Sequence, residues 1–323
     1  RYSHQFNDKS IEGYLNNTLT KIAYGGIYDH IGGGFSRYAT DQKWHIPHFE
    51  KMLYDNAQLV SLYAKAYLKT KNELYKNVVF ETLNFVKEEL TTKHGAFYSS
   101  LDADSKNKLG VKEEGAFYEW KVNELEEQLG NDFELFKEFY NINAYGAWEK
   151  DSYVLIRNQS KVVFSKEQKI TLATLNDKVS KWKKVLKEAR SKRSKPNLDD
   201  KVLTSWNALM IQGYIDAYKA FGTKEYLDIA LKNANFLVTN QLRKEGGLNR
   251  NFKNGKSTIN AYAEDYATVI HAFISLYEVT LDEKWLTSSK KLTAYLFVNF
   301  FDKKNGMFHF TSKEDESLIA RKY

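Results

Sequence analysis

Residues 204–221 read TSWNALMIQGYIDAYKAF, and apolar side chains recur in this stretch at steps of three and four on almost every face of a helix. Such a pattern is typical of a helix that is buried on both sides. The same pattern runs through HFEKMLYDNAQLVSLYAKAYL at residues 48–68 and NAYAEDYATVIHAFISLYEV at residues 260–279. By contrast, TKEYLDIALKNANFLVTNQL at residues 223–242 is amphipathic. We therefore expect helix pairs, each with an inner helix and an outer partner.

The rest of the chain repeats this arrangement. Proline occurs only at Pro47 and Pro196, which favours long uninterrupted helices. Helical periodicity also runs through residues 9–24, 72–90, 121–140, 166–190 and 283–300. Short glycine-aromatic segments separate the pairs: GGGFSRY from Gly32, GAFYSS from Gly95, GAFYEW from Gly115, GGLNRNF from Gly246 and NGMFHF from Asn305.

The spacing of these segments predicts the fold. Gly32 and Gly95, and again Gly246 and Gly306, are roughly 60 residues apart, which accommodates two helices and their turns. A repeat of this kind indicates an all-α (α/α)6 toroid, a barrel of helical hairpins joined by short glycine-aromatic β-turn segments. We predict a single such domain over residues 1–323. About four or five pairs are visible, so we expect an incomplete ring or a last helix pair beyond Tyr323.

Composition excludes several classes of protein. Of the 323 residues, 42% are hydrophobic and 28% are charged, and no apolar run is long enough to span a membrane. Cysteine is absent, which excludes disulfides, thiolate metal ligands and a cysteine nucleophile from this segment. Much of the net charge of +7 lies in residues 178–196, where it fits the solvated face of a helix. We therefore expect neither a membrane nor a nucleic-acid partner.

Aromatic residues are unusually frequent. The chain has 22 Tyr, 20 Phe and 6 Trp, together 15% of its residues. Most of these rings are expected to fill a large helical core. Because Tyr and Trp combine an apolar face with a polar edge, others could form platforms on which sugar rings stack.

Polar residues cluster where the first inner helix is predicted to begin. Five of them follow Pro47: His48, Glu50, Lys51, Asp55 and Asn56. Because helical residues at steps of three and four share a face, His48, Met52 and Asp55 would lie together and converge on the cavity. Alternatively, Pro47 occupies the first helical position, Glu50 favours the positive helix end, and the other groups are satisfied locally.

The second inner helix begins within LDDKVLTSWNAL, from Leu198. Thr204 is predicted to be its N-cap. The polar residues that we assign to a ligand site here are Asp200, Lys201, Trp206 and Asn207.

The third inner helix begins within NAYAEDYATVI, with Asn260 as the predicted cap. Its first turns carry Glu264, Asp265 and Tyr266. Two carboxylates on a buried helix are costly unless they are paired or solvated, so a polar pocket is expected.

Two loops add further candidates. The first, residues 28–49, supplies Asp29, His30, Arg37, Tyr38 and Trp44 around three glycines, and it lacks the spacing of a phosphate-binding loop. The second, residues 99–120, supplies Asp102, Asp104, Glu114 and Glu119. Its DADS string lacks the glycine and the terminal glutamate of a calcium-binding hand. We therefore expect no metal and no cofactor.

Several of these motifs resemble a known family. They are GGIYDHIGGGFSRYATDQKWHIPHFEKMLYDNAQL at 25–59, SLDADS at 100–105, EEGAFYEW at 113–120, DDKVLTSWNALMI at 199–211 and AEDYA at 263–267. Together they are similar to the proteins related to spermatogenesis-associated protein 20. That resemblance implies a thioredoxin-like domain followed by an (α/α)6 barrel, in a cytoplasmic protein. This chain would correspond to the barrel, without the thioredoxin-like domain and its last helix pair.

The resemblance also implies a class of chemistry. The barrel of this family is similar to N-acylglucosamine 2-epimerases, cellobiose 2-epimerases and six-hairpin glycosidases, so a carbohydrate-like ligand is expected in the mouth of the barrel. Hydrolysis would need two carboxyl groups about 5 to 10 Å apart. The candidates are Asp55, Asp102, Asp200, Glu264 and Asp265. Epimerisation would need an acid and a base that act near neutral pH, for which His48 and His30 are the candidates.

A binding or scaffold module without catalytic activity is the alternative. In such a module the aromatic walls would remain while the carboxylates pair with Lys51, Lys201 or Arg37.

The predicted pairing of His48 with Asp55 on one helical face favours proton transfer over hydrolysis. The residues predicted to bind substrate are Asp29, Arg37, Tyr38, Trp44, Glu50, Lys51, Asn56, Asp102, Asp104, Lys201, Trp206, Asn207 and Tyr266.

Overall fold

The computed structural model describes residues 2–149, 152–315 and 321–322. Two compact units are formed, each from two stretches of chain. Unit 1 consists of Arg1–Met52 and Leu101–Asn197, and unit 2 consists of Leu53–Ser100 and Leu198–Tyr323. None of the described helices is long and apolar enough to cross a membrane.

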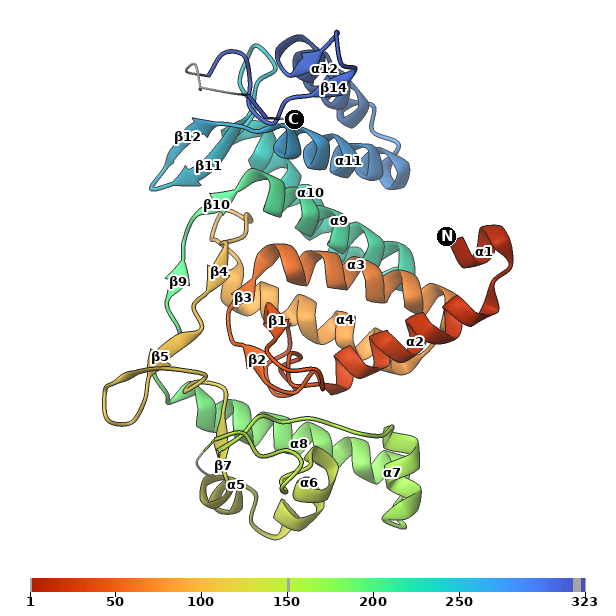
Figure 1. Cartoon of the computed structure of the whole chain (residues 1–323), viewed down its shortest axis with the longest axis vertical. Helices are drawn as coiled ribbons and strands as arrows, with labels where there is room; N and C mark the ends of the chain where they lie inside the picture. Colours follow the sequence, from red (N-terminus) through yellow and green to blue (C-terminus); the bar gives the residue numbers. More distant parts are fainter. Residues whose placement is uncertain (1, 150–151, 316–320, 323) are drawn as a thin grey trace. The chain divides into compact units, whose positions relative to one another are not determined.

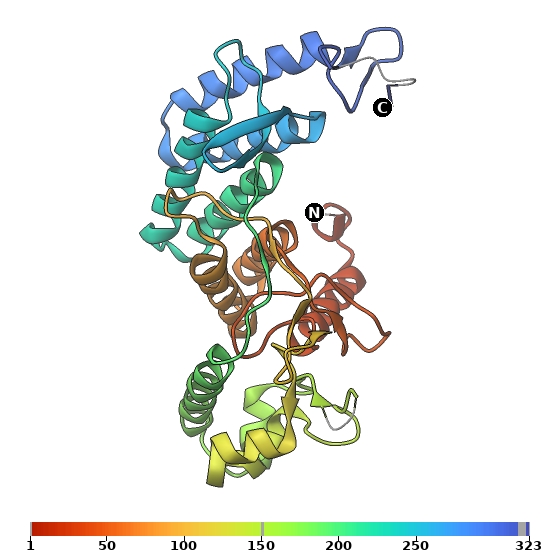
Figure 2. The same ribbon diagram turned by 90° about the vertical axis from the view of Figure 1, so that its left-hand side faces the viewer.

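Unit 2 is built from three helical hairpins. They are α3 (Leu53–Thr70) with α4 (Glu73–Phe85) and the π-helical turn Val86–Leu90, α9 (Thr204–Phe221) with α10 (Lys224–Asn240), and α11 (Ala263–Thr280) with α12 (Lys284–Asn299). The hairpins follow one another in space as in sequence, and α9 packs against α3, α10 and α11 (Figures 1 and 2). Accordingly, α9 buries residues around its whole circumference, as its apolar pattern predicts.

Short strands connect these hairpins. A three-stranded antiparallel sheet has the order β10 (Val202–Leu203), β11 (Asn249–Lys253) and β12 (Lys256–Asn260). β13 (Phe301–Asp302) pairs with β14 (Met307–Phe308), and β9 (Leu198–Asp199) precedes β10. The sheet places β11 beside the first turns of α9, because Leu203 pairs with Asn251.

Unit 1 combines shorter helices with two-residue and three-residue strands. Its helices are α1 (Tyr2–Phe6), α2 (Lys9–Tyr24), α5 (Val122–Leu129), the 3-10 turn Gly130–Asp132, α6 (Phe133–Tyr140), α7 (Lys161–Glu167) and α8 (Leu172–Ser191). Its strands include β1 (Tyr38–Ala39), β2 (Pro47–His48), β3 (Lys51–Met52), β5 (Asp104–Lys106), β6 (Lys112–Glu114), β7 (Trp120–Lys121) and β8 (Ser152–Tyr153), while β4 is Ser100–Leu101. A core of aromatic and aliphatic side chains from α5, α6 and α8 surrounds Trp182.

The all-α class and the helical hairpins predicted from the sequence are confirmed. The helices predicted at 9–24, 72–90, 205–221, 224–242, 261–280 and 283–300 are present, and each predicted end lies within two residues of the observed end.

Two longer predicted helices are interrupted. Residues 121–140 form α5 and α6, separated at Gly130, whose φ of 52° and ψ of −126° cannot continue a helix. Residues 166–190 divide into α7 and α8, because Thr171 caps a new helix by accepting a hydrogen bond from the Thr174 amide.

The predicted start of the first inner helix is wrong. Residues 47–52 are extended: His48 pairs with Tyr38, and the Arg37 amide donates to the Glu50 carbonyl. The helix begins only at Leu53. His48 and Asp55 therefore do not share a helical face. The apolar residues Phe49 and Met52 imitate helical spacing, but strand pairing provides the backbone hydrogen bonds here.

Both predicted helix caps are also wrong. Thr204 lies inside the first turn of α9, and its hydroxyl donates to the Asn249 carbonyl at 2.7 Å instead of capping. Asn260 ends β12, and the residue that precedes α11 is Tyr262. At Asn260 the sheet occupies the position predicted for the cap, whereas at Thr204 the helix itself begins one residue earlier than predicted.

Candidate functional site

An imidazole lies between two carboxylates in unit 1. We call this group the His48 cluster; it consists of Arg37, Tyr38, His48, Glu50 and Glu114. His48 Nδ1 lies 2.7 Å from Glu114 Oε1, and His48 Nε2 lies 3.3 Å from Glu50 Oε2. Arg37 Nη1 donates to the same Glu50 oxygen at 3.2 Å. The side chain of His48 is 26% exposed, so part of the ring is in contact with solvent.

Strand pairing positions these side chains. β1 and β2 place Tyr38 opposite His48, and their rings stack with centroids 5.1 Å apart. Glu114 comes from the β5–β6 hairpin, where it pairs with Asp104, and its Oε1 also accepts a hydrogen bond from the Phe49 amide. The cluster is thereby built from two hairpins that are about 65 residues apart in sequence.

The loop between β1 and β2 is held by Asp41. Its carboxylate accepts the amides of Lys43, His45 and Ile46. Burial would raise the pKa of Asp41, but these amide donors lower it below its usual value. Trp44 lies in this loop with a φ of 59°, a conformation that bulky residues rarely adopt, and its side chain is partly exposed.

The geometry fixes how His48 can carry a proton. A carboxylate only accepts hydrogen bonds, so Nδ1 of His48 must donate to Glu114. In the neutral ring Nε2 is then the basic nitrogen, and on taking a proton it gains Glu50 as an ionic partner. This arrangement can accept a proton from a bound molecule and return it.

A second group of charges in unit 1 is buried. Asp29 binds Lys51 Nζ at 2.8 Å and both terminal nitrogens of Arg190 at 2.9 Å; we call these three residues the Asp29 cluster. Burial would raise the pKa of Asp29, but Arg190 and Lys51 lower it well below its usual value. A Cβ on Gly32 would lie 2.1 Å from Arg190 Nη2, so only glycine fits beside this ion pair.

His30 lies beside this buried group. Its side chain is 4% exposed, and Nε2 contacts the carbonyls of Tyr24 and Gly25 at 3.2 Å. The adjoining cavity, lined by Asp29 and His30 among others, has a volume of ≈ 20 Å³, enough for about one water molecule. The position of His30 fits a structural role better than the predicted catalytic one.

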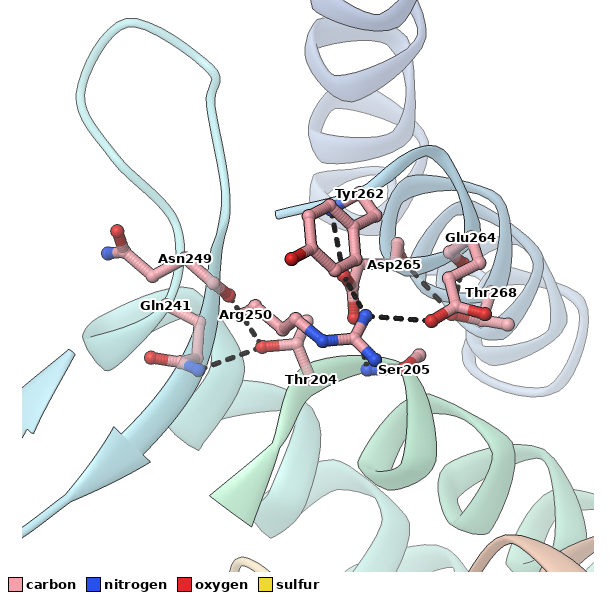
Figure 3. A network of polar contacts seen from close by, with 9 residues as sticks. All are labelled: Thr204, Ser205, Gln241, Asn249, Arg250, Tyr262, Glu264, Asp265 and Thr268. Atoms are coloured by element: carbon pink, nitrogen blue, oxygen red, sulfur yellow. Dashed lines mark hydrogen bonds and ion pairs between the residues drawn. The ribbon is translucent and has the colours of Figure 1, made fainter. Parts of the chain in front are cut away.

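Unit 2 contains a network around an arginine (Figure 3). We call it the Arg250 cluster; it consists of Ser205, Arg250, Tyr262, Glu264 and Asp265. Arg250 Nη1 donates to Glu264 Oε1 at 2.7 Å and to Asp265 Oδ2 at 2.9 Å. The face of Tyr262 lies 4.6 Å from the guanidinium carbon. The cluster contains Glu264 and Asp265 of the third predicted group, and none of the predicted ligand residues of the second group.

Asp265 connects two helix ends within this cluster. Its carboxylate accepts the Ser205 amide of α9 at 2.9 Å and the Tyr262 amide before α11 at 2.9 Å. The side chain is 0% exposed. Burial raises the pKa of Asp265, and Arg250 with the Tyr262 amide lowers it only in part. These contacts fit a structural acceptor better than a catalytic acid.

Most other predicted residues of unit 2 have defined partners. Asp200 binds Lys253 at 2.5 Å, and this hydrogen bond lowers its pKa. Lys201 binds Asp199 at 2.6 Å. The Asn207 amide group bridges the backbone N–H and C=O of Phe97.

The remaining predicted residues lie in varied surroundings. The Tyr266 hydroxyl accepts the Leu248 amide, and burial raises the pKa of Tyr266 to about 12. The Trp206 ring packs edge-on against Tyr54. Asp55 and buried Asn56 lie in the first turn of α3. In unit 1, Asp102 is 3.9 Å from Lys112 and Asp104 is part-buried in β5.

Five residues of the three clusters are not among the site residues predicted from the sequence: Glu114, Arg190, Ser205, Arg250 and Tyr262. Glu114 is one of four acids in its loop, and its spacing does not distinguish it from the others. A signal for Arg250 exists: GGFSR at residues 33–37 and GGLNR at residues 246–250 both place an arginine three residues after a glycine pair.

Within the described ranges, no group of three or more His, Asp or Glu side chains could hold a metal ion.

Comparison with known proteins identifies the relatives of this chain. Human spermatogenesis-associated protein 20 is 32% identical over 318 residues, which are 90% of this chain and 40% of that protein. An uncharacterized protein of Caenorhabditis elegans is 33% identical over 334 residues, covering 95% of this chain and 45% of its own length. This chain is homologous to spermatogenesis-associated protein 20. The family resemblance inferred from the motifs is confirmed, and the chain spans less than half the length of these relatives.

A family model and a solved structure are also similar to this chain. Residues 172–316 match the family model of the β-L-arabinofuranosidase GH127 catalytic domain. The cellobiose 2-epimerase from Spirochaeta thermophila has a TM-score of 0.50 and 12% identity, over 93% of this chain and 60% of the epimerase. This second likeness establishes the fold shared with (α/α)6-barrel proteins.

Proposed function

We propose that this chain is part of a carbohydrate-active protein, and that its His48 cluster moves a proton on and off a sugar, as in epimerisation or isomerisation. The sugar class is supported by the match to a glycosidase domain and by the fold shared with a sugar epimerase. The type of reaction is supported by one observation: the His48 imidazole lies between Glu114 and Glu50.

The proposed step is a proton transfer at carbon. Nε2 of neutral His48 would take the proton from the carbon next to the carbonyl of an open-chain sugar, and the C–H electron pair would move into an enediolate. Glu50 would then stabilise the imidazolium. Return of the proton from His48 to the neighbouring carbon gives the isomer. The epimer forms when the enediolate turns its opposite face toward His48 before the proton returns, or when water supplies the proton on that face while His48 passes its own proton to solvent. Tyr38, stacked on His48, would offer a surface for the sugar.

Hydrolysis is less well supported by the carboxylates. It needs one carboxyl group that stays protonated. Asp200 is paired with Lys253, while Glu264 and Asp265 share Arg250. Lys253 lowers the pKa of Asp200, which favours its ionised form. Burial raises the pKa of Asp265, but this side chain is 0% exposed and accepts two backbone amides besides Arg250, so a substrate cannot reach it.

The alternative function is a binding or scaffold module. It is favoured by the three cations named in the sequence analysis, since Lys51 binds Asp29, Lys201 binds Asp199 and Arg37 binds Glu50. A thioredoxin-like partner domain and a cytoplasmic location stay predictions.

Solvent exchange tests the proposal and separates it from both alternatives. The full chain would be incubated in D2O with a panel of aldoses and ketoses, and proton NMR would follow deuterium uptake at the carbon next to the carbonyl. The proposed reaction incorporates solvent deuterium. Release of a reducing sugar from an arabinofuranoside without exchange would indicate hydrolysis, and saturable binding without either would indicate a binding module.

Variants assign the exchange to the His48 cluster. His48→Gln should lower the exchange rate by about 100-fold or more, and Glu114→Gln by a smaller factor, because loss of the base removes general-base catalysis. His94→Gln, which changes an exposed histidine of unit 2, is the matched control. Full exchange in His48→Gln would contradict the proposal.

A further inference from the structure

The guanidinium of Arg250 has one occupied side and one open side. Glu264 and Asp265 both bind Nη1. Among the described residues, no hydrogen bond joins Nε or Nη2 of Arg250 to the protein. These two nitrogens form the edge that presents two parallel N–H donors, the geometry that matches a planar carboxylate.

Its neighbours hold this guanidinium in place. Asp265 is 0% exposed and anchors Nη1 from below the surface, while the ring of Tyr262 lies against the guanidinium face at 4.6 Å. The Arg250 side chain is still 19% exposed. A ligand therefore meets donors that are already oriented, which reduces the entropy lost on binding.

The start of α9 lies beside Arg250, but it is already paired with a carboxylate. The Ser205 amide in its first turn donates to Asp265 Oδ1 at 2.9 Å. Ser205 itself is 3% exposed, and its hydrogen bonding to Asp265 helps to lower the pKa of that carboxyl group. Figure 3 shows Ser205 close to the guanidinium. The donors that remain for a ligand are therefore those of the Nε–Nη2 edge of Arg250.

The local charges limit what this ligand can be. Asp265 neutralises Arg250, and the carboxylate of Glu264, with 47% of its side chain exposed, opposes a second anion. A compact carboxylate with one negative charge meets less repulsion than a phosphate dianion, and it fits the planar edge.

We propose that the Nε–Nη2 edge of Arg250 is a binding site for the carboxylate of a small ligand. If the proposed function holds, this ligand is a sugar acid, and that part of the inference rests on the proposed function. The site itself requires only the contacts of the Arg250 cluster.

Binding to the full chain tests this site without any need for turnover. D-glucuronate, D-glucose, D-glucose 6-phosphate and acetate would be titrated at constant ionic strength, with binding measured by calorimetry. We expect D-glucuronate to bind and D-glucose to bind at least about tenfold more weakly, because it lacks the charge-assisted pair. Arg250→Lys keeps the charge but loses the two parallel donors, so it should weaken D-glucuronate binding by about tenfold or more.

Two further variants make the test specific. Glu264→Gln removes the opposing carboxylate and should strengthen D-glucuronate binding several-fold. Arg243→Lys is the matched control, because the same edge of Arg243 is already occupied: Nε lies 2.8 Å from Glu245 Oε1, and Nη2 donates to the Tyr295 hydroxyl at 2.7 Å. Its effect on D-glucuronate binding should be absent. Melting curves without ligand would show that each variant is folded.

The outcomes separate the two parts of the inference. Unchanged D-glucuronate binding in Arg250→Lys, absence of carboxylate binding in the unaltered chain, or equal binding of D-glucose 6-phosphate would each overturn the site. Acetate binding as tight as that of D-glucuronate, with the same loss in Arg250→Lys, would support the carboxylate site and overturn its assignment to a sugar acid.

Discussion

Arg37 and Arg250 come from the similar segments GGFSR and GGLNR, yet they have different partners. The Arg37 side chain is 45% exposed and binds Glu50, itself 27% exposed, at 3.2 Å. Arg250 is 19% exposed and binds fully buried Asp265 at 2.9 Å. Similar local sequences thus supply an arginine to each of two polar clusters. The burial of the carboxylate that binds each arginine decides how much the free energy of unfolding falls when the ion pair is broken.

The largest expected effect is at the buried acceptor. Asp265→Ala leaves Arg250 partly buried without its main partner and removes a hydrogen-bond acceptor from two helix starts, so it should lower the free energy of unfolding by about 3–5 kcal/mol. Urea denaturation would measure the change. Asp228→Ala, in an exposed i,i+4 pair with Lys224, is the control and should change stability by less than about 0.5 kcal/mol. Equal effects of the two variants would remove the distinction between buried and exposed pairs.

The pH dependence of stability should distinguish two buried carboxylates. The pKa of Asp29 is lowered in the fold, so its contribution is present above the usual value of 3.8 and is lost as the pH falls through the folded pKa. The pKa of Asp265 is raised, so its contribution is present below 3.8 and is lost as the pH rises through the folded pKa.

Asparagine variants make this contrast measurable. The stability difference between the unaltered chain and Asp29→Asn should shrink as the pH is lowered below 3.8. For Asp265→Asn the difference should instead grow as the pH is lowered toward 3.8. Denaturation curves over a pH series would check both slopes, and slopes of the same sign would show that burial does not control the pKa of Asp265.

A smaller effect is expected at the glycine pairs that precede the two arginines. Gly34 has a φ of 78°, so Gly34→Ala forces a left-handed alanine and should cost about 1–2 kcal/mol. Gly247 has no positive φ, and a Cβ there would meet the flexible end of Arg243. Thermal unfolding should therefore show a larger loss for Gly34→Ala than for Gly247→Ala, and the reverse order would mean that steric room matters more than backbone conformation.

The smallest effect is expected at the exposed arginine. Arg37→Gln should lower the free energy of unfolding by less than about 1 kcal/mol, because the Arg37–Glu50 pair is largely solvated. Urea denaturation beside Arg250→Gln would give the comparison. A loss at Arg37 as large as that at Arg250 would show that exposure does not separate the two pairs.

Local periodicity predicted the helices well, because the burial of α9 around its circumference follows from its own residues. The extended stretch before α3 was not predicted, since the pairing of His48 with Tyr38 depends on a strand ten residues earlier. For the site, Glu264, Asp265 and His48 were identified by residue type. Their partners Arg250 and Glu114 were not, because local spacing does not encode contacts over 14 to 66 residues; the signal for Arg250 is the similarity of GGLNR to GGFSR.

The double role of Asp265 also concerns the order in which the chain can fold. The Ser205 amide at the start of α9 receives its acceptor from a residue 60 positions later. At synthesis rates of about 5–20 residues per second, α9 emerges roughly 3–12 s before that acceptor exists. During this interval the central helix of unit 2 has neither its first-turn acceptor nor its neighbour α11, and a chaperone has time to bind its apolar surface.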